Sequence, residues 1–217
     1  MPAIFPRWTN NVPIVIGLVA PLAGASLIFA VWYWFSPWFT DVGYRPDQPV
    51  AYSHKLHAGE LGIDCRYCHN TVEGTAHAAI PPAATCMNCH ELVKTESARL
   101  APVRESYATG EAIPWIRVHQ LPDFAFFNHS SHVAAGVGCA SCHGRVDQMV
   151  VVEMKQPLSM GWCLDCHRNP EPHLRPRDQV TNMAWDIEVD GKAYDANKDP
   201  TRTRDVLPPE HCSGCHR

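Results

Sequence analysis

Five copies of the pattern Cys-x-x-Cys-His constrain this chain more than any other feature. With ten cysteines and 13 histidines in 217 residues, chance alone would give about 0.03 copies. The five copies use all ten cysteines, so no cysteine remains for another role. They are Cys65-Cys68-His69, Cys86-Cys89-His90, Cys139-Cys142-His143, Cys163-Cys166-His167 and Cys212-Cys215-His216.

The pattern is typical of covalent haem c attachment. Two thiols at this spacing can add to the two vinyl groups of one porphyrin, and the histidine after the second cysteine reaches the iron. A disulfide framework gives no reason for that histidine, and such short loops gain little from closure. Structural zinc sites would use the cysteine pairs in twos, whereas five is odd. The sequence therefore predicts five covalently bound haems c, each with the histidine of its own motif as proximal ligand.

An apolar block near the N-terminus predicts a transmembrane helix. No charged residue occurs from Trp8 to Thr40, and the central stretch, 12–35, is long enough to cross a bilayer. The alternative is a signal peptide, whose apolar core is normally shorter. Arg7 precedes the block and Asp41 follows it, which favours a cytoplasmic N-terminus. Haem c is attached outside the cytoplasmic membrane, and all five motifs follow the block.

These observations predict three parts of the chain. Residues 1–11 are a cytoplasmic tail, 12–39 a transmembrane helix, and 40–217 a periplasmic pentahaem domain, so that the protein crosses the inner membrane once. Arg7 is the only charged residue before Asp41, and the formal net charge of −4 therefore leaves −5 for the rest of the chain. This acidic balance argues against a nucleic-acid partner.

The fold class follows from the scarcity of large aliphatic residues after Thr40 and from the 19 prolines of the chain. We expect a multihaem cytochrome c fold, rich in loops and short helices, in which the haems supply most of the core. Little strand is expected. The one hairpin signal is the alternation of Trp185, Ile187 and Val189 before Asp190-Gly191.

An internal repeat divides the haem domain. YSHKLHAGELGIDCRYCH at 52–69 aligns with FNHSSHVAAGVGCASCH at 127–143, and a second attachment motif follows each copy. This predicts two dihaem modules, at about 51–95 and 119–170, and a C-terminal haem site at 211–217.

Each repeat contains a His-x-x-His pair. Residues i and i+3 of a helical turn share one face, and a haem with a proximal histidine has only one axial position left. Two histidines must therefore serve two irons. The simplest assignment pairs His54 with His69, His57 with His90, His129 with His143 and His132 with His167.

The fifth haem needs a distal ligand from elsewhere. We prefer His119 for the haem on His216. The other candidates are His77, His173, His211 and a methionine, with Met160 and Met183 more typical of packing residues.

The repeats resemble the class III multihaem cytochromes of the c3 and c7 type. Over nearly the whole chain, the stretches DCRYCHNTVEGTAHAAIPPAATCMNCH, IPWIRVHQLPDFAFFNHSSH and QPLSMGWCLDCHRNPEP resemble the pentahaem cytochrome c subunit of alternative complex III. The resemblance implies membrane and iron–sulfur partner subunits, quinol oxidation by the complex, and electron transfer to a periplasmic cytochrome c or a terminal oxidase. A related cytochrome occurs in the quinone reductase complexes of sulfate reducers, so both directions of electron flow stay open.

Three function classes compete. They are an electron-transfer subunit without a catalytic centre, a multihaem enzyme, and a free-standing membrane-anchored quinol dehydrogenase. Eight histidines outside the motifs exceed the five distal positions, which disfavours an open, catalytic iron. No ionisable residue lies in the apolar span to accept quinol protons, which disfavours a quinol site there.

Overall fold

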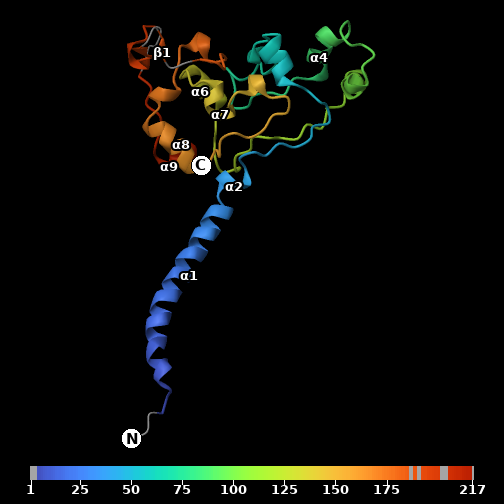
Figure 1. Ribbon diagram of the computed structural model, residues 1–217. Coiled ribbons are helices and arrows are strands. Elements are labelled where there is room, and N and C mark those ends of the chain that lie inside the picture. The colour runs from blue at the N-terminus through green and yellow to red at the C-terminus, as the bar shows by residue number, and fades with distance from the viewer. Residues whose placement is uncertain (1–3, 186–187, 190–191, 201–204, 217) are drawn as a thin grey trace. The chain divides into compact units, whose positions relative to one another are not determined.

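The computed structural model describes residues 4–185, 188–189, 192–200 and 205–216, and it divides the chain into two units. The first ends at Asp41 and the second begins at Val42. Figure 1 shows α1 as the main element of the first unit and many short helices joined by loops in the second.

The first unit is a single apolar helix with short flanking turns. The 3-10 helix η1 (Arg7–Asn11) leads into α1 (Val12–Trp34), and α2 (Pro37–Thr40) follows. At 1.5 Å per residue the 23 residues of α1 span about 34 Å. Its large apolar side chains are exposed within this unit. The helix is therefore long and apolar enough to cross a membrane.

The second unit is built from short helices, and its regular elements follow the attachment motifs. In chain order the helices are η2 (Lys55–Glu60), α3 (Cys65–Cys68), α4 (Ala83–His90), η3 (Ala98–Leu100), α5 (Ala101–Thr109), α6 (His129–Ala134), α7 (Cys139–His143), η4 (Val146–Gln148), α8 (Met160–Arg168), η5 (Glu171–His173), η6 (Arg177–Gln179), η7 (Ala196–Lys198) and α9 (Cys212–Cys215).

Strand content is small. β1 (Glu188–Val189) pairs antiparallel with β2 (Lys192–Ala193), in the register Glu188 opposite Ala193 and Val189 opposite Lys192. The strands lie where the hairpin is predicted, although Ile187, Asp190 and Gly191 fall outside the described residues. The predicted architecture, rich in loops and short helices with little strand, is confirmed in the described residues.

Buried apolar side chains form only small groups. The cluster of Val50, Ala83, Met87 and Val103 packs α4 against α5. Leu174 and Val180 are buried elsewhere in the second unit, as are Met149 and Met154. A chain of this length normally has a larger core, and large cofactors between the short helices would account for the difference.

The two His-x-x-His turns differ in their helical hydrogen bonding. In α6 the bond from Ala135 N to Ser131 O, 3.0 Å long, has the ordinary α-helical spacing. In η2, which is a π-helix, Leu61 N bonds to Leu56 O, five residues earlier, at 2.9 Å. Gly62 (φ 68°) and Gly136 (φ 81°) follow the two turns in the left-handed region that glycine favours.

Candidate haem-binding site

All five Cys-x-x-Cys pairs lie on single turns of helix. The turns are α3, the C-terminal part of α4, α7, the middle of α8, and α9. Cysteines three residues apart on such a turn share one face. Asp64 caps α3 by accepting a 2.8 Å bond from Arg66 N, and Ser159 caps α8. All ten thiols are free, so each pair presents two sulfur atoms side by side.

The thiols fit covalent addition to a porphyrin better than a zinc site. Burial raises the pKa of Cys65 to about 11 and that of Cys142 to about 12. In the described part of the chain, no three His, Cys, Asp or Glu side chains gather so that they could hold a metal ion.

Four of the five proximal histidines are oriented by a backbone carbonyl. A carbonyl oxygen can only accept, so the ring nitrogen beside it must be the protonated donor. The bonds run from Nδ1 of His69 to Ala79 O (2.7 Å), His90 to Val93 O (3.0 Å), His167 to Pro209 O (2.7 Å) and His216 to Phe124 O (3.0 Å). In each ring this leaves the Nε2 lone pair for an iron.

Three of the predicted distal histidines show the same arrangement. Their Nδ1 atoms donate to Ser53 O from His57 (2.9 Å), to Ala76 O from His129 (2.8 Å) and to Asn128 O from His132 (2.8 Å). Histidines that bind metal commonly hold their orientation through such a bond from the other ring nitrogen. Seven histidines of the chain thus have Nδ1 bonded to a backbone carbonyl, an arrangement common among histidines that bind metal.

For three of the four predicted ligand pairs, the two imidazole rings lie close together. The ring centroids are 6.3 Å apart for His57 and His90, 6.4 Å for His129 and His143, and 6.1 Å for His132 and His167. Metal–nitrogen bonds of about 2 Å on opposite sides of one iron would place two imidazole centroids roughly 6 Å apart. These pairs therefore have the spacing of two axial ligands of one haem.

The fourth predicted pair, His54 and His69, is less regular. Burial, and then the charges of His69 and His57, lower the pKa of His54 to about 4. The ring is therefore neutral at pH 7 and close to His69. Its Nδ1 atom is buried and has no hydrogen-bond partner among the described residues, unlike Nδ1 of the equivalent His129.

His119 lies at the third attachment site rather than at the fifth. Its ring centroid is 4.4 Å from that of His143, with an interplanar angle of 78°. That separation is too small for an iron between the rings. Phe124 instead lies beside His216, with ring centroids 5.8 Å apart, and Phe126 N bonds to Cys215 O at 2.8 Å. The segment after His119, rather than His119 itself, thus approaches the fifth site.

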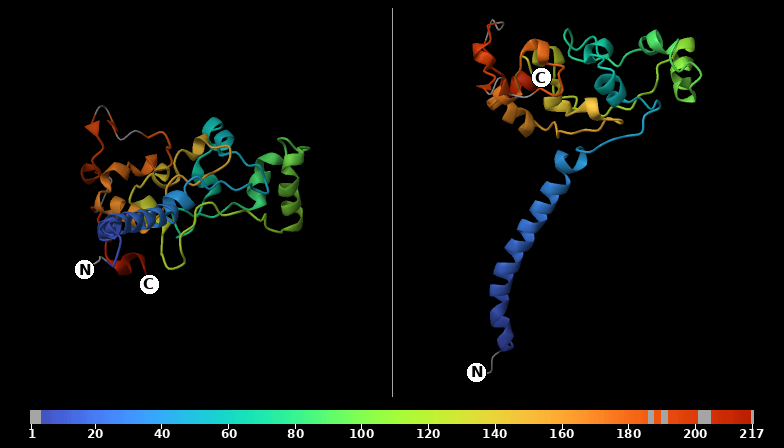
Figure 2. Two further views of the ribbon diagram at one scale, coloured as in Figure 1. Left: turned by 60° about the horizontal axis from the view of Figure 1, so that its bottom comes forward. Right: turned by 45° about the horizontal axis from the view of Figure 1, so that its top comes forward.

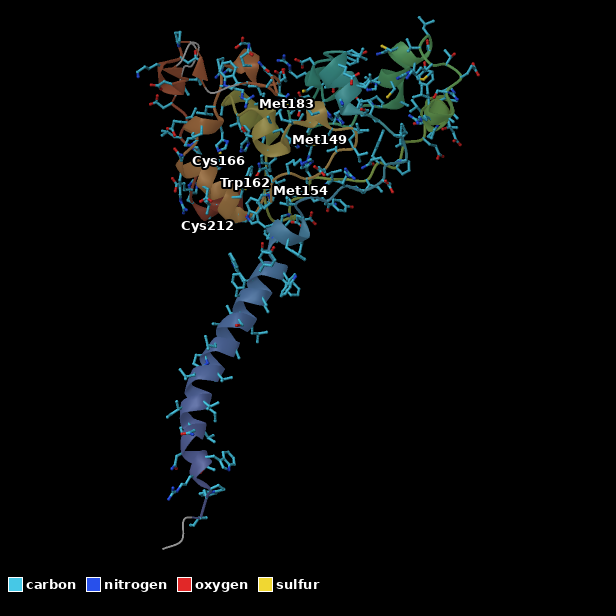
Figure 3. The ribbon with its side chains drawn as sticks, viewed as in Figure 1. Met149, Met154, Trp162, Cys166, Met183 and Cys212 are labelled. Atoms are coloured by element: carbon cyan, nitrogen blue, oxygen red, sulfur yellow. The ribbon has the colours of Figure 1, made fainter. Side chains whose placement is uncertain are left out.

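The other candidates for the fifth distal ligand lie as follows. His211 precedes α9, and its Nε2 is near Gly214. The backbone carbonyl of His173 accepts from Gly138 N beside the third site. The carbonyl of His77 accepts from two threonines, and Met160 begins α8 with an exposed side chain. Figure 3 shows Cys166, Trp162 and Cys212 at one end of the second unit, with Met183 apart from them.

An aromatic ring packs against both histidines of each His-x-x-His turn. Tyr52 stacks on His57 at 4.4 Å and meets His54 edge-on at 4.8 Å. Phe127 packs on His132 at 4.5 Å and meets His129 edge-on at 4.7 Å. The aromatic residue is visible in the sequence repeat, but the sequence does not predict that its ring packs against both histidines.

Arg175 packs beside the third attachment turn, a contact that the sequence does not predict. Its guanidinium is buried, it donates a 2.7 Å bond to Asn182 O, and it lies directly against Gly138, where a Cβ would overlap it. Gly138 precedes the third attachment turn, so the missing side chain makes room for the arginine. No local motif marks such a contact.

These features define a class: the protein is a multihaem cytochrome c with covalently attached haem. A family model described as cytochrome c7 and related cytochrome c matches residues 125–217. The chain is also 30% identical over 186 residues to the menaquinone reductase, multihaem cytochrome c subunit, of Nitratidesulfovibrio vulgaris (strain Hildenborough), covering 75% of this chain and 82% of that protein. The chain belongs to the multihaem cytochrome c family of this subunit.

Proposed function

We propose that this chain is an electron-transfer subunit that relays electrons through five c-type haems. The relay would connect the quinone-linked, iron–sulfur subunits of a membrane complex with a periplasmic cytochrome c or a terminal oxidase. In this proposal the chain has no catalytic centre of its own. The complex as a whole carries out the oxidation or reduction of the quinone.

One observation carries this proposal. Three pairs of histidines have the spacing of trans axial ligands, 6.1 to 6.4 Å between ring centroids, and five of these six rings are oriented by a carbonyl bonded to Nδ1. An iron with protein ligands on both faces has no position for a substrate. Such a haem can exchange electrons but cannot bind a reactant.

The proposed ligand set takes three pairs from this geometry and adds the pair His54 and His69 from the sequence repeat. Each cysteine pair would hold one haem by two thioether bonds, and the histidine after it would be the proximal ligand. The proposed distal ligands are His54, His57, His129 and His132, for the haems on His69, His90, His143 and His167. His119, the sequence-based candidate for the fifth haem, lies beside His143 instead; because His129 is the proposed ligand opposite His143, we propose that His119 packs at the third haem without binding its iron.

The membrane arrangement is also part of the proposal. We propose that residues 1–11 are cytoplasmic, that 12–39 cross the inner membrane, and that 40–217 form the periplasmic haem domain, with its modules at about 51–95 and 119–170 and its last haem site at 211–217. The length and apolar surface of α1 support an anchor. Haem attachment outside the cytoplasm supports the orientation.

The direction of electron flow separates two versions of the proposal. The resemblance to the pentahaem subunit of alternative complex III supports quinol oxidation, and we adopt that direction. The name of the relative, a menaquinone reductase subunit, supports the reverse direction as the second candidate. The absence of Asp, Glu, His, Lys and Arg from Val12 to Trp34 argues against a free-standing quinol dehydrogenase that uses this helix as its quinol site.

The proposal can be tested on the tagged full-length protein purified from its own membranes in mild detergent. We expect five haems per chain by pyridine haemochrome, co-purifying iron–sulfur and membrane subunits, and rapid haem reduction by a menaquinol analogue. Haems that stay oxidised with quinol but transfer electrons to menaquinone would support the reductase version. A cytochrome that purifies alone and reacts with neither would refute both.

A further inference from the structure

The first two attachment turns are hydrogen-bonded to each other. Asn88 lies between Cys86 and Cys89, and its Nδ2 donates to Tyr67 Oη at 3.1 Å; Tyr67 lies between Cys65 and Cys68. The His-x-x-His turn at the start of η2 reaches the second site, because the ring of His57 faces that of His90 at 6.3 Å. The first and second haem sites are therefore neighbours.

Two consecutive residues join the first site to the third. Thr181 Oγ1 donates to Asp64 Oδ2, at 2.9 Å, directly before Cys65. The carbonyl of Val180 accepts from Cys139 N at 3.1 Å. Burial, and then the nearby Cys139, raise the pKa of the Cys65 thiol, as expected for cysteines that lie close together.

The third and fourth sites share the turn α6. His129 and His132 lie one helical turn apart on it, and their rings face His143 and His167 at 6.4 and 6.1 Å. After burial, the neighbouring thiols of Cys166 and Cys163 contribute most to the raised pKa of Cys142. The second module thus repeats the arrangement of the first. Within the second module, the third haem site is the one that lies next to the first haem site.

The fourth and fifth sites are joined by the segment that leads into α9. His167 Nδ1 donates to Pro209 O at 2.7 Å, and Arg168 pairs with Glu210 at 3.4 Å. Burial, and then the Cys215 thiol, raise the pKa of Cys163, which agrees with this junction. Figures 1 and 2 show α8 and α9 at one end of the second unit and α4 at the other.

From these junctions we propose that the five haem sites form one unbranched series, in the order second, first, third, fourth, fifth. This inference rests on the proposed relay function. The haem on Cys86 and Cys89 and the haem on Cys212 and Cys215 are then the two ends, where electrons enter and leave. The order differs from the order along the chain because the first module joins the second through its first haem.

The order predicts how the relay breaks when single haems are removed. Five double variants, each with both cysteines of one motif changed to alanine, would be purified in the full complex and mixed rapidly with a menaquinol analogue. Loss of the third haem should divide the four remaining haems into two that are reduced rapidly and two that are not. Loss of the first should divide them into one and three, and loss of the fourth into three and one. Loss of an end haem should leave all four connected to each other.

The divisions after loss of the first, third or fourth haem hold for either entry end, because only the identity of the rapid group changes. Loss of the exit haem should leave all four remaining haems rapid, and loss of the entry haem should leave all four slow. Rapid reduction of all four haems after loss of the third would overturn the order, as would a two-and-two division after loss of the second or the fifth. Failure of the unchanged complex to react with quinol at all would refute the quinol-oxidising function and not the order.

A second measurement tests the order without quinol. It uses variants that keep both cysteines of every attachment motif. Methionine ligation raises a haem's potential, so His143→Met, His90→Met and His216→Met would each mark one haem. In a potentiometric titration followed by EPR, His143→Met should shift two other haems, and the end variants should each shift one. A shift of two haems by His90→Met or His216→Met would contradict the proposed ends.

Discussion

The two dihaem modules have nearly the same local structure, yet they differ by one residue between the second histidine of the turn and the next cysteine. His57 and Cys65 are eight positions apart, whereas His132 and Cys139 are seven. The first module places its extra residue in the π-helical turn η2, while the second keeps the ordinary turn α6. A π-turn is the usual way in which a helix absorbs one inserted residue. The comparison shows that the ligand geometry tolerates a change in the spacer.

The modules also differ in what orients the first histidine of each turn. His129 donates from Nδ1 to Ala76 O, a carbonyl of the first module. His54 has no such acceptor among the described residues. The first module therefore supplies the acceptor that orients a histidine of the second, and His54 lacks an equivalent bond to any described residue.

The largest expected effect comes from removing these two histidines. His129→Ala should convert one haem to the high-spin state and also remove the Nδ1 bond to Ala76 O between the modules, a loss of about 0.5–1.5 kcal/mol, while the backbone nitrogen of residue 129 still donates to that carbonyl at 3.2 Å. His54→Ala should convert one haem as well, but without this second cost. EPR counts the high-spin haems, and thermal unfolding compares the two variants. Equal unfolding temperatures would contradict the asymmetry.

A smaller effect on stability is expected at Gly59, where the π-helical turn η2 passes close to the backbone of η4. A Cβ at Gly59 would overlap Asp147 O in η4, and a backbone oxygen cannot rotate away. We expect Gly59→Ala to lower the free energy of unfolding by about 1–3 kcal/mol.

The equivalent residue in the second module is Ala134, which provides the matched control. Ala134→Gly should cost only about 1 kcal/mol, through helix propensity. Chemical denaturation of both holo-proteins measures the difference. A Gly59→Ala variant no less stable than Ala134→Gly would show that η2 can move away from η4.

Features that depend on short sequence separations could be predicted from the sequence. The facing rings of His57 and His90, and of His132 and His167, follow from helical spacing and from the repeat. The short helices and the near absence of strand follow from the proline content and from the scarcity of aliphatic residues. Each of these features is decided by residues close together in the chain.

Features that depend on how loops cross could not be predicted. His119 lies against His143 because of the path of the connecting segment, and the same path brings Phe124 to His216. The packing of Arg175 against Gly138 joins residues 37 positions apart in sequence. No local pattern encodes these contacts, because they arise only when the modules and the C-terminal segment pack around the haems.

His119→Ala tests whether His119, which lies beside His143, is an axial ligand of a haem iron. Because His129 already has the spacing of a distal ligand to His143, we expect the variant to keep its number of low-spin haems, with a modest loss of stability from the missing ring. EPR and near-infrared magnetic circular dichroism count the ligand types. Appearance of one high-spin haem would show that His119 is an axial ligand after all.

The smallest effect is expected for the aromatic residue before each turn, which is Tyr52 in the first module and Phe127 in the second. Both rings pack on the second histidine of the turn, at 4.4 and 4.5 Å, and meet the first edge-on. Burial, with smaller contributions from nearby cysteines, raises the pKa of the Tyr52 hydroxyl, which therefore stays neutral. The ring rather than the hydroxyl should then orient the imidazoles.

We therefore expect the exchanges Tyr52→Phe and Phe127→Tyr to change stability by no more than about 0.5 kcal/mol and to leave the EPR g-values in place. Tyr52→Leu and Phe127→Leu remove the flat face against which the imidazole packs, so each should shift the g-values of the haems served by its own turn and leave the other module unchanged. If Tyr52→Phe shifts the spectrum as far as Tyr52→Leu does, the hydroxyl takes part in orienting His54 or His57. The two modules would then differ electronically as well as in their spacers.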